Sequence, residues 1–145
     1  MFTPQDVLAI ARIANEFRAI EEDLPVSYVA VLAYIARHEL AKGEGPNQSE
    51  VSNMTGIAKP GMSRIVKALS SERMGATPAG EKRPPGSRPS LKLVDRHTDP
   101  TDSRMVRLRL TPKGRALLGR VADILNTHTH GDTTWQFAKG GTDLK

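Results

Sequence analysis

The sequence predicts a mainly α-helical fold with one small β-hairpin, an α+β arrangement built as a single domain. Apolar residues recur with helical spacing through most of the first 70 residues and again after Thr111. Between these stretches lies a segment that alternates apolar and basic residues, which is typical of a strand. The length of 145 residues suits one domain.

Two helices are predicted before residue 46. Thr3-Pro4 is a helix cap followed by proline at the first helical position, and helical apolar spacing continues from there to Ile20. This helix is expected to end near Asp23, because Pro25 disfavours helical conformation in the residue before it. A second helix is predicted from Ser27 to the glycines at 43 and 45. Its buried face would hold Val31, Leu32 and Ile35.

The stretch 47–72 predicts two short helices joined by a tight turn. Asn47 or Ser49 can cap the first helix, and Gly56 supplies the left-handed conformation that the turn needs. Pro60 opens the second helix. The buried stripe of this helix is expected to be Met62, Ile65, Val66 and Leu69.

A hairpin is predicted after an irregular segment. Residues 75–90 contain three glycines, four prolines and four charged residues, so no regular element is expected there. A strand over 91–95 and a second one with Leu108 and Leu110 flank the turn-forming "HTDPTDS". Thr111-Pro112 then starts a last amphipathic helix. We therefore expect a domain over 1–127, with 75–90 as a flexible basic insert and 128–145 as a polar, disordered tail.

Positive charge is concentrated in one part of the chain. The net charge is +5, yet residues 58–115 carry 14 basic and 5 acidic side chains, whereas residues 1–57 carry 4 basic and 8 acidic ones. Such a concentration indicates a polyanionic partner, usually nucleic acid or an anionic membrane. A solvated basic surface without a partner would give the same pattern.

Several classes of protein are disfavoured. No run of ~18 apolar residues is present, and the N-terminus lacks the basic start and apolar core of a signal peptide, so we expect a cytoplasmic protein without a membrane span. Cysteine is absent, which excludes disulfides and thiolate metal sites. His128 and His130 lie two residues apart, but a metal site needs three or four converging ligands. Neither a metal nor another cofactor is expected.

The predicted order of elements is that of a winged helix-turn-helix with flanking helices. The second helix of such a motif fits the major groove of DNA. The hairpin can lie along the DNA backbone and place an arginine in the minor groove, where the negative potential is strong. The order therefore favours double-stranded DNA as the partner.

Two segments resemble the MarR family of winged-helix transcriptional regulators. They are "QSEVSNMTGIAKPGMSRIVKAL" and "DRHTDPTDSRMVRLRLTPKGRALL". The family's wing typically reads Asp-Pro, Asp, Arg, an alternating strand and Leu-Thr-x-x-Gly, which makes the second segment the more specific. The matching positions here are Asp99-Pro100, Asp102, Arg104, Leu108, Leu110, Thr111 and Gly114. The likeness covers roughly residues 27–125.

The resemblance implies a homodimer in which each subunit places a recognition helix and a wing on DNA. It also implies that Asp102 orients the wing arginine, Arg104. The residues that match the recognition helix are Lys59, Pro60, Gly61, Ser63, Arg64 and Lys67. Around the wing turn we expect DNA contacts from Arg96, Arg104 and Arg107, with Arg107 on the solvent face of the second strand.

The chain departs from the family pattern in three places. The link at 75–90 is longer than usual, and we expect Lys82, Arg83 and Arg88 there to extend the DNA contact. Only one C-terminal helix is predicted where the family usually has two. Many members bind small phenolic ligands, but no residue pattern here marks a pocket for a small-molecule effector. Dimer contacts are expected from Val7, Ile10, Phe17, Leu117, Leu118, Val121 and Leu125.

These features predict a sequence-specific regulator of transcription that binds double-stranded DNA as a repressor, although activation is equally compatible with them. An enzyme is not expected, because no nucleophile, base or phosphate loop accompanies Asp99 and Asp102. Two alternatives stay open. One is a winged-helix protein-interaction module for an acidic partner such as RNA polymerase or a replication factor. The other is a weakly specific nucleic-acid binder, although no Phe, Tyr or Trp lies between residues 35 and 134 to stack on single strands.

Overall fold

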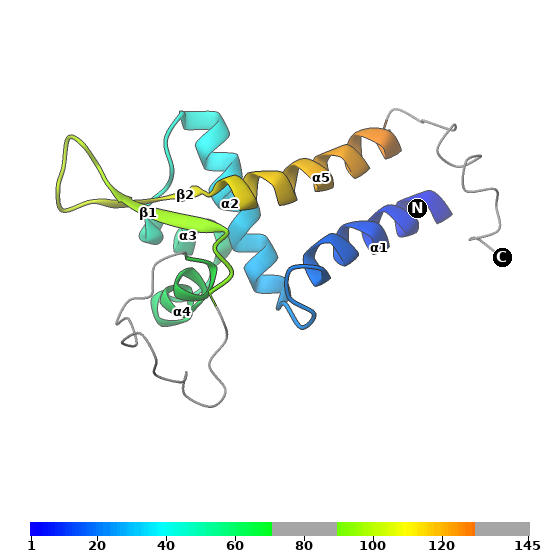
Figure 1. Cartoon of the computed structure of the whole chain (residues 1–145), viewed down its shortest axis with the longest axis horizontal. Helices are drawn as coiled ribbons and strands as arrows, with labels where there is room; N and C mark the ends of the chain where they lie inside the picture. The colour runs from blue at the N-terminus through cyan, green and yellow to red at the C-terminus, as the bar shows by residue number, and fades with distance from the viewer. Residues whose placement is uncertain (71–89, 130–145) are drawn as a thin grey trace.

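The computed structural model describes residues 1–70 and 90–129, and it confirms the α+β fold with one hairpin (Figure 1). In chain order its elements are α1 (Pro4–Arg18), α2 (Val26–Lys42), α3 (Gln48–Thr55), α4 (Lys59–Leu69), β1 (Val94–Thr98), β2 (Val106–Leu110) and α5 (Pro112–Thr129). Helices α2, α3 and α4 surround the core beside the hairpin, while α1 and α5 pack on each other and extend away from it (Figure 1). None of the helices in the described ranges combines the length and the apolar character that crossing a membrane requires.

Helix α1 begins where the sequence predicts but ends earlier. Thr3 and Asp6 form a reciprocal capping box, in which each side chain accepts a hydrogen bond from the other residue's backbone amide. The helix ends at Arg18, so the predicted end near Asp23 is wrong. The amides of Ile20 and Leu24 instead bond to carbonyls three residues back, and both side chains pack against the core in successive turns. Pro25 therefore marks the latest possible end of the helix and not its actual end.

Helices α2, α3 and α4 confirm the predicted helix-turn-helix region. Helix α2 buries Val31, Leu32 and Ile35 and ends at Gly43, whose φ of 75° is the left-handed conformation of a C-cap. Asn47 caps α3 by accepting a hydrogen bond from the amide of Glu50, and Gly56 ends α3 with a φ of 75°. Helix α4 buries the expected stripe of Met62, Ile65, Val66 and Leu69.

The hairpin pairs β1 and β2 antiparallel, with Val94 opposite Leu110 and Thr98 opposite Val106. The predicted first strand at 91–95 is therefore displaced by three residues. The amides of Leu91 and Leu93 donate to the carbonyls of Ala68 and Leu69, so this apolar run follows the end of α4 and is not part of the ladder. Leu91 and Leu93 are buried while Lys92 is exposed, and this strand-like alternation explains why the predicted strand began at residue 91. We call β1, β2 and the turn between them (94–110) the wing.

Helix α5 starts in a tight contact with the segment before the wing. The Thr111 hydroxyl donates to the carbonyl of Lys92 and accepts a hydrogen bond from the amide of Gly114. A Cβ added to Gly114 would lie 2.3 Å from the carbonyl oxygen of Leu93, so only glycine fits there. The Leu-Thr-x-x-Gly pattern is therefore the joint between wing and helix. Helix α5 then runs to Thr129, two residues beyond the expected domain end at 127.

A short link between α2 and α3 packs against the open edge of β2. The amide of Leu108 donates to the carbonyl of Pro46 over 2.8 Å, and Asn47 forms an isolated bridge with Arg107. Gly45 lies so close to β2 that an added Cβ would be 1.5 Å from the carbonyl oxygen of Leu108. This link (45–47) therefore joins the helix-turn-helix to the wing.

We expect Gly45→Ala to lower the free energy of unfolding by at least ~2 kcal/mol, because the methyl group must push β2 away from the link. Urea unfolding followed by circular dichroism measures the change. Gly119→Ala is the control: Gly119 lies within α5 with open space around it, so alanine there should raise stability by about 0.5–1 kcal/mol. Equal stabilities for Gly45→Ala and the wild type would contradict the tight contact.

Candidate nucleic-acid interface

The outer face of α4 carries the predicted recognition residues. Met62 and Ile65 turn the opposite face into the core, which leaves Lys59, Pro60, Arg64 and Lys67 exposed and Gly61 and Ser63 half-buried. Within residues 1–70 and 90–129, no carboxylate forms an ion pair with Lys59, Arg64 or Lys67. The helix N-cap, Ala58, supplies no side-chain hydrogen bond. This face therefore offers three cations and the N-terminus of a helix to an anionic partner.

The wing holds the other predicted contacts that the structure describes. Arg104 is exposed in the turn and Arg96 is half-buried on β1. Asp102 accepts a hydrogen bond of 3.0 Å from the backbone amide of Arg104. Its contact is thus with the backbone of the turn, and the described residues show no ion pair between Asp102 and the Arg104 guanidinium. Lys82, Arg83 and Arg88 lie outside the described residues.

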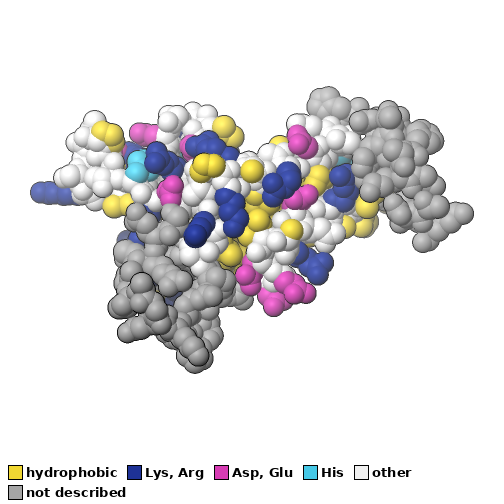
Figure 2. Space-filling model, viewed as in Figure 1, with side chains coloured by type: hydrophobic (Ala, Val, Ile, Leu, Met, Phe, Trp, Pro, Cys, Tyr) yellow, Lys and Arg dark blue, Asp and Glu magenta, His cyan; other side chains and the backbone are white. Residues whose placement is uncertain are grey.

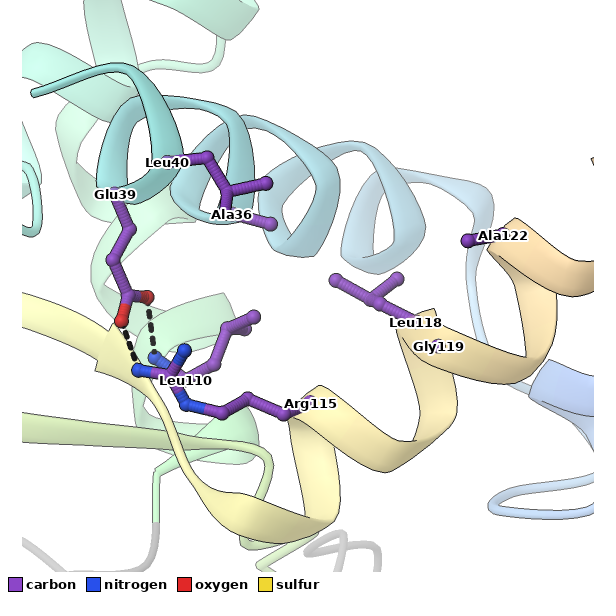
Figure 3. A pocket seen from close by; sticks show the side chains of 8 residues that line it. All are labelled: Ala36, Glu39, Leu40, Leu110, Arg115, Leu118, Gly119 and Ala122. Carbon is purple, nitrogen blue, oxygen red and sulfur yellow. Dashed lines mark hydrogen bonds and ion pairs between the residues drawn. The ribbon is translucent and has the colours of Figure 1, made fainter. Parts of the chain in front are cut away.

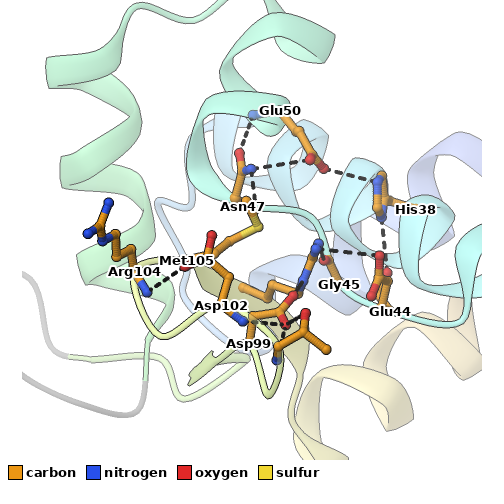
Figure 4. Close-up of polar contacts among 11 residues, drawn as sticks. His38, Glu44, Gly45, Asn47, Glu50, Asp99, Asp102, Arg104 and Met105 are labelled. Carbon is orange, nitrogen blue, oxygen red and sulfur yellow. Dashed lines mark hydrogen bonds and ion pairs between the residues drawn. The ribbon is translucent and has the colours of Figure 1, made fainter.

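The expectation that Arg107 projects into solvent is wrong. Its Nε donates to Asp99 Oδ2 over 2.6 Å, its Nη1 donates to the carbonyl of Gly45 over 3.0 Å, and its Nη2 lies 3.5 Å from Glu44 Oε1. Only 13% of the side chain is exposed. The 45–47 link, which packs along the edge of β2, also meets the Arg107 side chain through the Gly45 carbonyl, so Arg107 is largely shielded from solvent. We call Arg107, Asp99, Gly45 and Glu44 the wing clamp (Figure 4).

Asp99 organises the turn of the wing. One carboxylate oxygen accepts hydrogen bonds of 2.7 Å from both the amide and the hydroxyl of Thr101, and the other accepts from Arg107. The amide of Asp102 adds a longer bond of 3.3 Å. The hydrogen bonds from Thr101, and next those from Arg107, hold the pKa of Asp99 well below its usual range. Asp99 is therefore an ionised, nearly buried centre of the turn.

A second polar chain connects the wing clamp to α3. His38 on α2 places Nδ1 3.0 Å from the carbonyl of Glu44 and Nε2 3.0 Å from Glu50 Oε2 (Figure 4). The other carboxylate oxygen of Glu50 accepts from the Asn47 side chain. The sequence identified Asn47 as a cap but gave no sign of His38 or Glu50. The contact between these two residues depends on how α2 meets α3, and no local pattern encodes that meeting.

The predicted dimer residues divide between the core and the surface. Phe17 and Leu117, with 5% and 0% exposure, are buried inside the protomer, so their assignment to a dimer contact is wrong. Both sit on the inner side of the α1–α5 pair and fill the core. The remaining residues are accessible: Val7, Ile10 and Leu125 are exposed, and Leu118 and Val121 are half-buried. An ion pair from Arg120 to Glu16 at 2.8 Å joins the two helices, and His128 Nε2 lies 2.6 Å from Asp6 Oδ1.

A pocket of about 300 Å³, which the sequence did not indicate, lies between α2 and α5 (Figure 3). Its walls are mainly apolar and include Leu40, Leu110 and Leu118. An ion pair between Glu39 and Arg115 lies at one end, and Glu39 also accepts a hydrogen bond from the amide of Leu110.

Within the described ranges, no cluster of three or more His, Cys, Asp or Glu side chains could hold a metal ion.

Charged side chains are unevenly distributed over the surface. Figure 2 shows Lys and Arg side chains over the wing and the adjoining start of α5, and acidic side chains over the loop between α1 and α2. This distribution agrees with the excess of basic residues in the second half of the domain.

We expect the free energy of unfolding to fall less steeply with decreasing pH in Asp99→Asn than in the wild type. Below about pH 3.9, the ordinary pKa of aspartate, Asp99 becomes protonated in the unfolded chain but stays ionised in the folded protein. The contribution of Asp99 is therefore complete above that pH and is lost as the pH falls further. Urea unfolding at pH values between about 2 and 6 measures the effect. Asp123→Asn, at an exposed position on α5, is the control, and an unchanged acid slope in Asp99→Asn would contradict the assignment.

No protein-family model matches the chain, and no curated protein matches it. Solved structures do. RV1404 from Mycobacterium tuberculosis is 19% identical with a TM-score of 0.57, over 93% of this chain and 82% of that one. A mutant of S. aureus MepR bound to oligodeoxyribonucleotide is 15% identical with a TM-score of 0.52, over 100% of both chains. S. aureus MepR bound to ethidium bromide is 16% identical with a TM-score of 0.54, over 99% of this chain and 98% of that one. The chain therefore shares the winged helix-turn-helix fold of these proteins, the fold that its resemblance to the MarR family predicted.

Proposed function

We propose that the protein is a transcriptional regulator that binds double-stranded DNA sequence-specifically. The observation that carries this proposal is the outer face of α4, where Lys59, Arg64 and Lys67 surround the exposed side of a helix anchored by its opposite face. A rigid helix with exposed cations suits the major groove, where base edges can be distinguished. The MepR structure with bound oligodeoxyribonucleotide, which shares the fold, supports this choice of partner.

The proposal gives each part of the surface a role. Arg64 and Ser63 read base edges, while Lys59, Lys67 and the N-terminus of α4 hold phosphates. Arg96 and Arg104 on the wing contact the backbone or the minor groove. Lys82, Arg83 and Arg88 add contacts to phosphates. Bound at a promoter in the cytoplasm, the protein acts as a repressor by blocking access, and it catalyses no reaction.

The proposal is tested by equilibrium binding to labelled random duplex and to the matched single strand over a salt series. We expect binding to the duplex that weakens steeply with salt and little affinity for the single strand, because phosphate contacts release counterions. No duplex binding at low salt would overturn the proposal and would favour an acidic protein partner instead.

Arg64→Ala extends the same assay to a duplex site selected with the wild type. We expect it to lower the discrimination between selected and random duplex, by about 1–3 kcal/mol, because Arg64 reads bases. Arg18→Ala removes the same charge from the end of α1, where the guanidinium bonds to Asn15 of its own helix, and it should leave discrimination unchanged. An equal loss on selected and random DNA in Arg64→Ala would contradict base reading.

We further propose that the protein acts as a homodimer through α1 and α5. Val7, Ile10 and Leu125 form an apolar surface on these helices that the protomer itself leaves exposed. Leu118 and Val121 adjoin it. Two copies related by twofold symmetry would present two wings and two α4 helices to half-sites about 34–36 Å apart.

Ile10→Glu should convert the dimer to a monomer, because it places a charge in an apolar contact. Sedimentation equilibrium measures the change in mass. Val26→Glu is the matched control, since Val26 is 83% exposed at the start of α2, away from the proposed contact. A wild type that sediments as a monomer, or an Ile10→Glu variant that remains dimeric, would contradict the assigned surface.

A further inference from the structure

The arginine of the wing clamp points into the protein, unlike two other arginines of the wing. Arg104 and Arg109 are exposed, whereas Arg107 is enclosed and directed at three oxygens. A leucine would fill much of the same space without the cost of removing a charge from water. The guanidinium adds directional hydrogen bonds, because its planar fork of N–H groups fixes the geometry of every group that it binds.

The three oxygens belong to different parts of the fold. Asp99 stands at the start of the wing turn, while Glu44 and Gly45 lie between α2 and α3, with Gly45 as the first residue of the 45–47 link. Arg107 lies between them on β2 and bonds to both sides. The guanidinium therefore connects the turn that carries Arg104 to the helix-turn-helix that presents α4.

A backbone hydrogen bond supports the connection between the wing and the helix-turn-helix, but only at the base of the wing. The Leu108 amide bonds to the Pro46 carbonyl, which holds the base of the wing against the link. The turn at 99–105 extends beyond this bond. The ion pair from Arg107 to Asp99 reaches it from the middle of β2 over 2.6 Å, whereas the Asn47 side-chain amide reaches it through a contact of 4.0 Å with the sulfur of Met105. Without that pair the base would stay attached while the turn could change its angle.

We propose that Arg107 is the positioning residue of the wing: it fixes the angle between the wing turn and α4 so that both meet one DNA half-site together. This inference rests on the proposed function. Arg107 itself touches no DNA and acts through Asp99. A wing that is already set in its bound direction loses less conformational freedom on binding, which raises affinity for the specific site.

Two substitutions separate positioning from simple charge. Arg107→Lys keeps the positive charge but removes the planar fork whose Nε bonds to Asp99 while Nη1 bonds to Gly45. Asp99→Asn removes a negative charge, which by electrostatics alone would strengthen DNA binding. We expect both to weaken binding to a duplex site selected with the wild type by about tenfold, and to weaken random duplex much less. Arg109→Lys, two residues away on the same strand and exposed, should bind like the wild type.

Hydroxyl-radical footprinting supplies a readout that lost stability would not produce. With variants shown by circular dichroism to be folded at the assay temperature, protection by the wing at the edges of the site should disappear while protection by α4 remains. Wild-type affinity in Arg107→Lys and Asp99→Asn, or an equal loss of both protected regions, would overturn the inference while leaving duplex binding intact. A wild type that binds no duplex would instead overturn the proposed function and this inference with it.

Discussion

The contact between β2 and the 45–47 link is the constraint on which the rest of the structure depends. Two strands of five residues form only a marginal hairpin in water without further packing. Here the hairpin has one face on the core, through Leu108 and Leu110, and one edge on the link, through the bond from Leu108 to Pro46. The same link begins α3 at Asn47, so the position of the wing and the start of the helix-turn-helix are set by one short segment.

The molecule separates its tasks along its length. The exposed apolar residues of α1 and α5 lie on the pair of helices that extends from the core, while the exposed cations of α4 and Arg104 lie on the elements around the wing. The pocket between α2 and α5, with the pair of Glu39 and Arg115 at one end, lies where these two regions meet. A change in how α5 packs on α2 would thus shift both the α1–α5 pair and the elements around the wing.

Local signals in the sequence predicted most of the fold. Thr3, Asn47, Gly43 and Gly56 cap their helices through residues close in the sequence, so the boundaries that they define were predicted correctly. The errors concern packing. Alternation along β2 separates its two faces, but it does not say that a link covers the face of Arg107. Helical spacing likewise placed Phe17 and Leu117 on an apolar side without distinguishing the protomer's own core from a partner.

At the junction between α4 and the wing, the end of α4 and the segment that leads into β1 lie side by side. Ser70 forms an isolated bridge with Val94, and the Ser90 hydroxyl bonds to the carbonyl of Ser70, so the chain departs at residue 70 and returns at residue 90 to the same point. Hydrogen bonds between residues 68–70 and 90–93 hold the two ends together. Since the entropy of closing a loop grows only with the logarithm of its length, doubling the connection would cost about 0.6 kcal/mol. Evolution can therefore lengthen or shorten this connection while the helix and the wing on either side keep their positions.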